Sequence, residues 1–240
     1  MYLLLVAAIF ISSCGDEKSK SNTEDKGVIQ PLAEHNYSVE LVPENMTVKE
    51  KKMRFISLLL PAIETVYSDL ENLHRETSKL IDSEPESEQL ALLKEIYKAE
   101  NNQALLDAIK PHPKSIALAQ AAMESAWGTS RFFTQANNVF GVWSFDKNGS
   151  RLAAGEQRNG KTIWVKKYSS INESISDYYK VLARGAVYQQ FREKKVTNQS
   201  PYELVKQLDR YSEKGDEYGK ELASMIRFNK FEQYDKVTAE

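Results

Sequence analysis

Residues 119–128 read Ala-Gln-Ala-Ala-Met-Glu-Ser-Ala-Trp-Gly, which places a single carboxylate, Glu124, near the end of an otherwise almost apolar helix. An ionised carboxylate is costly to remove from water, so a Glu in such a segment needs a charged partner, a neutral form or a cleft. A carboxylic acid with a raised pKa is suited to general acid catalysis. The simpler alternative is a Glu on the solvent-exposed edge of the helix.

The composition is that of an ordinary globular protein. With 240 residues, 41% of them hydrophobic, the chain is long enough for one main domain plus extensions. Its 32 basic and 34 acidic residues give a net charge of −2, which does not indicate a partner among nucleic acids. His35, His74 and His112 are scattered along the chain, and no spacing resembles a metal site. We therefore expect neither a metal nor another cofactor.

The first residues resemble a bacterial lipoprotein signal. Residues 3–11 form an apolar run of signal-peptide length that is short for a membrane span. The next residues, Ser-Ser-Cys, resemble the end of a lipobox, in which the cysteine is lipidated and becomes the mature N-terminus. We therefore expect a signal peptide over residues 1–13, lipidation of Cys14, and attachment to a membrane of the cell envelope on the periplasmic or outer-membrane side. No Lys or Arg precedes the apolar run, and a truncated ordinary signal or a buried helix start are the alternatives.

A tether and a helical extension are predicted next. Residues 14–46 are largely polar or irregular, as expected of a flexible segment between a membrane and a domain. Thr47, with Glu50 three residues later, forms a capping box at the start of a long helix with apolar residues at helical spacing. Shorter helical segments follow. We assign residues 47–112 to an N-terminal helical extension.

The rest of the chain, residues 113–240, predicts a helical domain with one small β-lobe. Ser115 is a plausible N-cap of the helix that carries Glu124, and Gly128 is placed to end that helix. Residues 144–165 combine turn signals with short β-branched runs, a pattern typical of a β-hairpin. Helical periodicity then returns. The predicted fold class is therefore α+β and mostly helical.

Two neighbouring motifs resemble the glucosaminidases of glycoside hydrolase family 73. Residues 113–132 contain the Glu-Ser-Ala-Trp-Gly sequence, and residues 137–143 read Asn-Asn-Val-Phe-Gly-Val-Trp. Within that family the sequence resembles the Bax-like proteins, and the likeness extends over about residues 51–229. It implies a lysozyme-like fold and hydrolysis of peptidoglycan glycan strands at the linkage between N-acetylglucosamine and N-acetylmuramic acid.

The resemblance implies a role for each matching residue. Glu124 occupies the position of the family's proton donor, which protonates the glycosidic oxygen. Gln120 and Trp127 share its helix face and are expected to bind substrate in a groove, as are Asn138 and Phe140 in the turn that follows. For Trp127 the alternative is an anchor in the core, and for Asn138 it is a structural turn residue.

A second carboxylate and a tyrosine complete the expected catalytic site. Glu156, within residues 155–160, resembles the Glu of the family's hairpin and would activate water or stabilise the oxocarbenium-like state. Glu173 competes for this role, although its place at a helix start indicates a cap. Tyr211, within the turn 211–218, resembles the tyrosine whose hydroxyl faces the cleft near the proton donor. An ordinary surface tyrosine is the alternative.

The sequence thus favours an endo-β-N-acetylglucosaminidase with a lysozyme-like fold. Two alternatives stay open. A lytic transglycosylase has a similar fold and the same Glu-Ser pair but forms an anhydro sugar with one acid. An inactive peptidoglycan-binding scaffold protein would retain the fold alone. The presence of Glu124, Glu156 and Tyr211 together argues against the scaffold, and the Glu156 hairpin favours hydrolysis.

Overall fold

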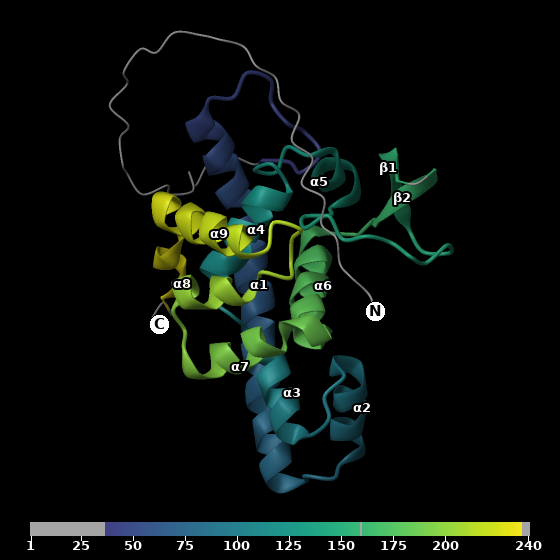
Figure 1. Cartoon of the computed structure of the whole chain (residues 1–240), viewed down its shortest axis with the longest axis vertical. Coiled ribbons are helices and arrows are strands. Elements are labelled where there is room, and N and C mark those ends of the chain that lie inside the picture. Colours follow the sequence, from purple (N-terminus) through teal and green to yellow (C-terminus); the bar gives the residue numbers. More distant parts are fainter. Residues whose placement is uncertain (1–36, 159, 237–240) are drawn as a thin grey trace.

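The structure, a computed structural model, describes residues 37–158 and 160–236. The predicted signal peptide, Cys14 and most of the tether fall outside these residues. Within the described part of the chain, helices form the body and a two-stranded antiparallel sheet stands out from it (Figure 1). This arrangement confirms the mostly helical α+β class and the small hairpin lobe. No helix in the described ranges is both long and apolar enough to cross a lipid bilayer.

The elements follow one another in a simple order. The α-helices are α1 (Val48–Ser83), α2 (Glu88–Tyr97), α3 (Asn102–Ile109), α4 (Lys114–Glu124), α5 (Arg131–Ala136), α6 (Ile171–Arg184), α7 (Gln189–Thr197), α8 (Pro201–Leu204) and α9 (Asp216–Asn229). The strands are β1 (Arg151–Arg158) and β2 (Lys161–Lys166). Three 3₁₀ helices complete the described part: η1 (Ala186–Tyr188), η2 (Val205–Gln207) and η3 (Phe231–Asp235).

The long helix α1 begins where the capping box predicts. The Thr47 hydroxyl accepts a hydrogen bond from the Glu50 amide at 3.2 Å, and the Glu50 carboxylate accepts one from the Thr47 amide at 2.8 Å. These two bonds satisfy amides that a helix end otherwise leaves without a partner. The helix then continues through Pro61 for 36 residues in all. Its first half packs against α4 and α6 in the main core.

The second half of α1 belongs to a smaller apolar cluster. There α2 and α3 pack against it, at the lower end of the molecule in Figure 1. Buried members of this cluster include Leu90, Tyr97, Leu105 and Ile109. Because α1 takes part in both clusters, the extension and the main domain share a helix in their packing. The boundary between residues 112 and 113 stays a prediction.

Helix α4 lies in the main core between α1 and α9. Its residues from Ser115 to Ala122 are buried, as expected of a helix that is apolar on almost every side. It starts at Lys114 and ends at Glu124, so Ser115 does not act as its N-cap and Gly128 lies beyond it. The Ser115 amide and hydroxyl instead donate to the Asp235 carboxylate at 2.8 and 2.6 Å. A side chain from η3 therefore caps the first turn of α4, which local sequence signals could not reveal.

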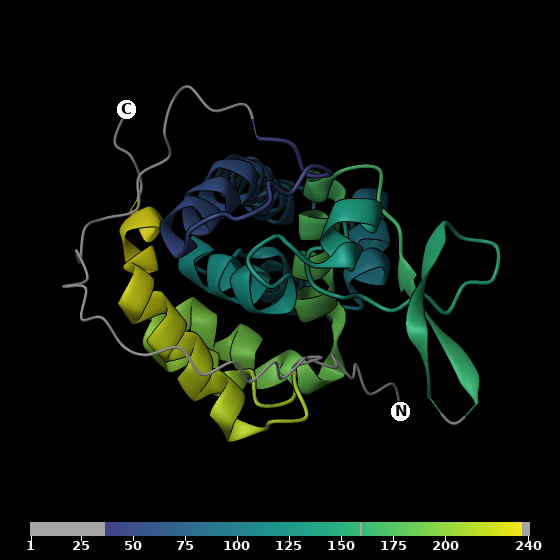
Figure 2. The ribbon, with the colours of Figure 1, turned by 90° about the horizontal axis from the view of Figure 1, so that it is seen from above.

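The hairpin extends away from the helices, as Figure 2 shows from above. Arg151 pairs with Lys166 at one end and Arg158 with Lys161 at the other, with a shift of register between Ala153 and Gln157. Such a shift is typical of a β-bulge, which bends a strand and changes the direction of its side chains.

Candidate active site

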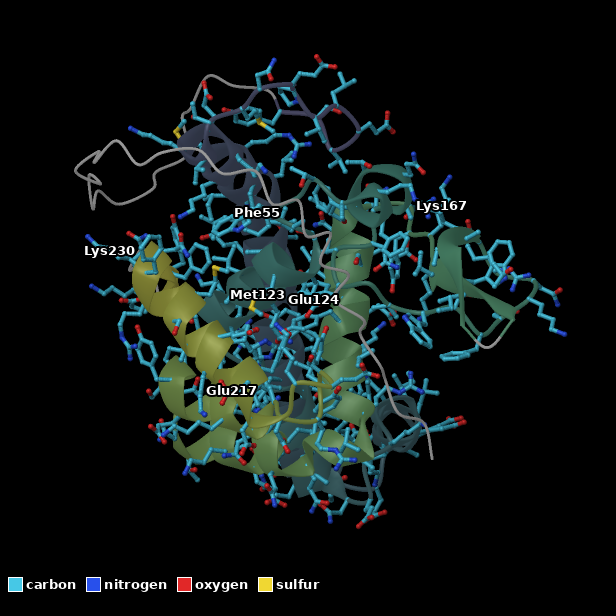
Figure 3. All side chains as sticks on the ribbon, turned by 45° about the horizontal axis from the view of Figure 1, so that its top comes forward. Phe55, Met123, Glu124, Lys167, Glu217 and Lys230 are labelled. Atoms are coloured by element: carbon cyan, nitrogen blue, oxygen red, sulfur yellow. The ribbon has the colours of Figure 1, made fainter. Side chains whose placement is uncertain are left out.

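Glu124 is the last residue of α4 and lies between α6 and α9 in the middle of the body (Figure 3). Burial raises the pKa of its carboxyl to about 7, whereas the hydrogen bond from Tyr218 and the positive charge of Lys214 lower it. An acid with a pKa near neutrality retains its proton in a large fraction of molecules and can give it to a substrate. The alternative of a fully solvated Glu on the helix edge is therefore not supported.

A chain of hydrogen bonds runs from Glu124 into the core. The Tyr218 hydroxyl donates to Glu124 Oε1 at 2.9 Å, and the Gln120 amide donates to the Tyr218 hydroxyl at 3.0 Å. The Tyr178 hydroxyl donates to Gln120 Oε1 at 2.6 Å, and His112 Nε2 lies 2.9 Å from the Tyr178 hydroxyl. Four elements thus supply these side chains: the segment before α4, α4 itself, α6 and α9. This series of hydrogen bonds holds the Glu124 side chain from the buried side of the site.

The inner members of this chain hold uncharged forms. Burial raises the pKa of Tyr178 and Tyr218 well above the usual value, so both hydroxyls stay protonated. Burial, with a smaller contribution from the positive charge of Lys195, lowers the pKa of His112 well below its usual value. The imidazole is therefore neutral at pH 7.

A turn of three residues with left-handed backbone follows the acid. Ala126, Trp127 and Gly128 have φ angles of 50°, 59° and 71°. For the two residues that carry a Cβ this conformation costs on the order of 1–2 kcal/mol each. Two hydrogen bonds hold the turn: the Trp127 amide donates to the Ala122 carbonyl at 2.9 Å, and the Gly128 amide donates to the Ser125 hydroxyl at 2.8 Å. The turn ends α4 directly after Glu124.

A buried arginine supports the same turn. The Arg54 side chain is 0% exposed, and its Nη1 donates to the Gly128 carbonyl at 2.8 Å. Its Nη2 contacts the carbonyls of Ser38, Val39 and Leu41 at 2.6, 3.1 and 3.2 Å. The guanidinium thus joins the segment before α1 to the turn after Glu124, through backbone oxygens that need a donor when buried.

Trp127 makes the contacts expected of an anchor in the core, which was the alternative to a sugar-binding role. Its ring is half-buried and lies edge-on to Phe55, with 5.2 Å between the ring centroids, and 6.1 Å from Phe231. Lys52 Nζ is 5.2 Å from the centroid of the same ring. The side chain therefore packs against α1 and η3, and a sugar contact stays a prediction for its exposed part.

The structure does not support Gln120 and Phe140 as substrate-binding residues. Both are 0% exposed, and a side chain without exposed surface cannot contact a sugar. Gln120 instead links Tyr178 to Tyr218 in the hydrogen-bonded chain. The Phe140 ring stacks on the Tyr178 ring with 3.9 Å between centroids. Both residues therefore hold the tyrosines that lie behind the acid.

Asn138 is a structural turn residue, the second of its two predicted roles. Its side-chain amide donates to the carbonyls of Val142 and Lys166, each at 2.9 Å, and its oxygen accepts from the Val142 amide at 2.9 Å. With 1% of its surface exposed, it has no face for a ligand. It fastens the end of β2 to the turn that follows α5.

The tyrosine whose hydroxyl reaches Glu124 is Tyr218, which the sequence did not single out. Tyr211 is buried and its ring stacks on that of Tyr218, with centroids 5.4 Å apart and an interplanar angle of 11°. Burial, with a smaller contribution from the negative charge of Glu124, raises the pKa of Tyr211 well above its usual value. A helical pattern offered one signal: Tyr218, Leu222 and Ile226 form the buried face of α9.

Glu156 and Glu173, the two candidates for the second carboxylate, lie in different elements. The backbone of Glu156 lies in β1, within the register shift between Ala153 and Gln157. Its catalytic role stays a prediction. Glu173 accepts from the amide and the hydroxyl of Ser169 at 2.8 and 2.7 Å, which confirms that it caps the start of α6. Across the described ranges, no three His, Cys, Asp or Glu side chains gather where they could hold a metal ion.

Comparison with known proteins identifies the family. The family described as mannosyl-glycoprotein endo-beta-N-acetylglucosaminidase, named Glucosaminidase, matches residues 99–231, more than half of the chain. The exo-glucosaminidase LytG of Bacillus subtilis is 27% identical over 169 residues, which cover 63% of this chain and 60% of LytG. Protein bax of Escherichia coli is 29% identical over 133 residues, 52% of this chain and 46% of that protein.

The chain thus spans between about half and three-fifths of the length of these two relatives. Among solved structures, the catalytic domain of the autolysin Auto from Listeria monocytogenes is 24% identical, with a TM-score of 0.44, and the match covers 61% of this chain and 87% of that one. The family match includes α4 with Glu124, the hairpin and α9. The chain is similar to Protein bax, and it belongs to the Glucosaminidase family, glycoside hydrolase family 73.

Proposed function

We propose that the chain hydrolyses the glycan strand of peptidoglycan as an endo-β-N-acetylglucosaminidase, with Glu124 as the general acid. The observation that carries this proposal is the state of Glu124: a carboxyl of pKa about 7 that is held through one oxygen by Tyr218. Family membership supports the substrate class. The description of the family supports endo cleavage, whereas the relative LytG is described as an exo-glucosaminidase.

We assign the following role to each group. Glu124 gives its proton to the glycosidic oxygen while the C–O bond breaks and positive charge develops on the sugar ring. The carboxylate that results keeps the hydrogen bond from Tyr218. Glu156, from the hairpin, would then activate the attacking water or stabilise the positive ring. The resemblance of residues 155–160 to the family's hairpin supports this assignment.

The products distinguish the proposal from its alternatives. Purified protein is incubated with peptidoglycan, and the released fragments are reduced with borohydride and separated. We expect fragments with reduced N-acetylglucosamine ends from many positions along the strand. Free N-acetylglucosamine would indicate exo cleavage instead, and anhydro-muramic ends would indicate a lytic transglycosylase. Binding to peptidoglycan without release of fragments would identify a scaffold protein and overturn the proposal. Glu124→Gln protein serves as the control for contaminating activity.

We also propose a location in the cell envelope outside the cytoplasm, because peptidoglycan lies there. The lipid anchor at Cys14 rests on the lipobox-like sequence alone. In cells, Cys14→Ala should abolish incorporation of labelled palmitate and move the protein out of the membrane fraction. A Cys14→Ala protein that stays in that fraction with unchanged mobility would overturn the lipoprotein assignment.

A further inference from the structure

Three side chains that lie behind Glu124 are almost completely buried. His112, Gln120 and Tyr178 are 1%, 0% and 1% exposed. They belong to the hydrogen-bonded chain that ends at Glu124, yet general acid catalysis by Glu124 does not require any of them. A row of polar side chains in an otherwise apolar core costs free energy unless every group is paired. In this series every hydrogen bond has a donor and an acceptor, and their order from His112 to Glu124 can be assigned.

Each hydroxyl has a single proton to donate, which fixes the direction of the chain. Tyr178 gives its proton to Gln120 Oε1, so in its contact with His112 the Tyr178 oxygen accepts and His112 Nε2 donates. Gln120 donates its amide proton to Tyr218, which leaves the Tyr218 proton for Glu124 Oε1. Every proton from His112 onward therefore points toward Glu124.

This direction decides which oxygen of Glu124 carries the acidic proton. Oε1 accepts from Tyr218 and has a donor in front of it. A proton on Oε1 would meet the Tyr218 proton head-on, so the neutral acid carries its proton on Oε2. After the proton leaves, the carboxylate still accepts from Tyr218. The same hydrogen-bond pattern thus serves the acid before and after proton transfer, and nothing in the core has to rotate.

The reversed chain would be unproductive. If the amide of Gln120 turned over, its oxygen would accept from Tyr218 and the Tyr218 proton would be lost to Glu124. The neutral acid would then donate from Oε1 to the Tyr218 oxygen, with its proton held toward the core. Turning Gln120 over would also place its NH₂ group against Tyr178, whose proton would have to go to His112. The orientation of one amide therefore separates a productive acid from an unproductive one.

We propose that His112, Tyr178 and Gln120 are positioning residues that act through Tyr218 and keep the transferable proton of Glu124 on Oε2. The proposal rests on the proposed function for its meaning in catalysis. The groups that act on Glu124 come from three parts of the chain: Tyr178 of α6, Tyr211 and Lys214 before α9, and Tyr218 of α9. Apart from the Tyr178 hydroxyl itself, all of these groups are the same in wild type and in Tyr178→Phe.

The test uses two matched variants of adjacent residues. Tyr178→Phe removes the hydroxyl that orients Gln120 and keeps the ring that stacks on Phe140. Tyr179→Phe is the control, because its ring stacks on His112 with 4.5 Å between centroids, while its buried hydroxyl has no hydrogen-bond partner among the described residues. Both changes remove one oxygen from the same helix.

Two readouts separate this proposal from the proposed function. The first is the pKa of Glu124, followed by ¹³C NMR of its carboxyl carbon and assigned with Glu124→Gln, which needs no substrate. The second is kcat on soluble glycan strands as a function of pH. Loss of the ordered bond from Tyr218 should raise the pKa of Glu124 by ~1 unit. It should also lower kcat ~10-fold with little change in KM and move the alkaline limb to higher pH.

Each outcome is decisive. Tyr178→Phe should change both readouts, and Tyr179→Phe should change neither. A Tyr178→Phe protein whose carboxyl titration matches that of Tyr179→Phe would overturn the positioning role, whatever its activity. A fall in kcat that follows a fall in melting temperature, without movement of the alkaline limb, would also overturn it. If wild type releases no glycan fragments but the NMR difference is present, the proposed function fails and the positioning role stands.

Discussion

The helical body and the hairpin lobe carry the two carboxylates that we propose for catalysis, and the backbone is held very differently in the two places. Glu124 ends a buried helix and is fixed by a hydrogen-bonded chain that reaches His112, on the far side of Gln120. Glu156 lies in a two-stranded sheet that projects from the body. An isolated two-stranded hairpin is only marginally stable in water. The acid is therefore positioned by the core, whereas the backbone that carries Glu156 is positioned by the few bonds that fasten the lobe.

Those fastening bonds can be named. Arg131 of α5 donates to the Ala153 carbonyl of β1 at 2.5 Å. Asn138 donates to the Lys166 carbonyl at the end of β2, and the Lys166 amide donates to the Val142 carbonyl at 2.9 Å. If the core alone positions Glu124, variants in the helical body should change the pKa and the proton transfer of Glu124. Variants at the fastening bonds should instead change the position of the lobe and leave Glu124 as it is.

The largest effect is expected at the acid. Glu124→Gln keeps the shape of the side chain but cannot donate the proton to a leaving oxygen. The rate of fragment release should fall well beyond ~10²-fold, the contribution of general acid catalysis alone. Circular dichroism should show an unchanged helical body. A folded Glu124→Gln protein that still clears peptidoglycan would remove Glu124 from its role.

The same substitution should change how stability depends on pH. The folded-state pKa of Glu124 is about 7 against an ordinary 4.5, so its contribution to stability is full below about pH 4.5 and is lost as the pH rises through 7. Between about pH 4 and pH 8, wild type should lose roughly 3 kcal/mol relative to Glu124→Gln. Urea unfolding at the two pH values measures this difference. A constant difference would show that the carboxyl is solvated.

The next largest effect is expected for the hydrogen bonds that fasten the lobe to the body. Asn138→Ala removes three buried hydrogen bonds and leaves backbone groups without partners, so it should lower the free energy of unfolding by about 2–3 kcal/mol. Asn137→Gly is the control: it keeps the left-handed backbone (φ 49°) and loses one side-chain bond at 3.1 Å. The carboxyl titration of Glu124 should be unchanged in both. A shifted titration in Asn138→Ala would show that the lobe also positions the acid.

The second carboxylate should have a smaller effect than the first. Glu156→Gln is expected to lower kcat by ~10²-fold, the low end for a single acid–base group, while binding to peptidoglycan changes little. Glu173→Gln, a change at a helix cap, should leave kcat within about 2-fold of wild type. If the two results are reversed, Glu173 takes the role that we assign to the hairpin.

The smallest effect is expected at Tyr211. Tyr211→Phe keeps the ring that stacks on Tyr218, so kcat should fall only ~3-fold, as for a hydroxyl near the acid but not bonded to it. Tyr188→Phe is the matched control, since its hydroxyl is buried and has no hydrogen-bond partner in the described ranges. Tyr218→Phe should lower kcat more than either of these variants. A larger loss in Tyr211→Phe than in Tyr218→Phe would exchange their roles.

Local signals predicted much of this molecule. The capping box at Thr47 and Glu50 set the start of α1, and turn residues between β-branched runs located the hairpin. The cap at Glu173 followed from its place at the start of a helix. In these three cases the deciding contacts lie within a few residues along the chain. Glu124 was noticed as a lone carboxylate in an apolar helix, and the motif that surrounds it, through its resemblance to the family, gave it the role of proton donor.

The rest depended on contacts between distant segments. The helical pattern of α9 marks Tyr218 as buried, but only the packing of α9 on α4 brings its hydroxyl, and not that of Tyr211, to Glu124. Gln120 and Phe140 were expected in the groove because they flank the motif, but their helix and turn face the tyrosines of α6 and α9. His112 and Tyr178 are 66 residues apart, and their pairing exists only in the folded core.

The buried guanidinium of Arg54 has a mechanical consequence. It holds the backbone of residues 38–41 and the turn after Glu124 with the same planar group. The chain therefore enters the body beside the catalytic turn, and a pull on the upstream end is borne first by these bonds and by α1. Any displacement of residues 38–41 is therefore passed to the turn after Glu124 through one shared side chain.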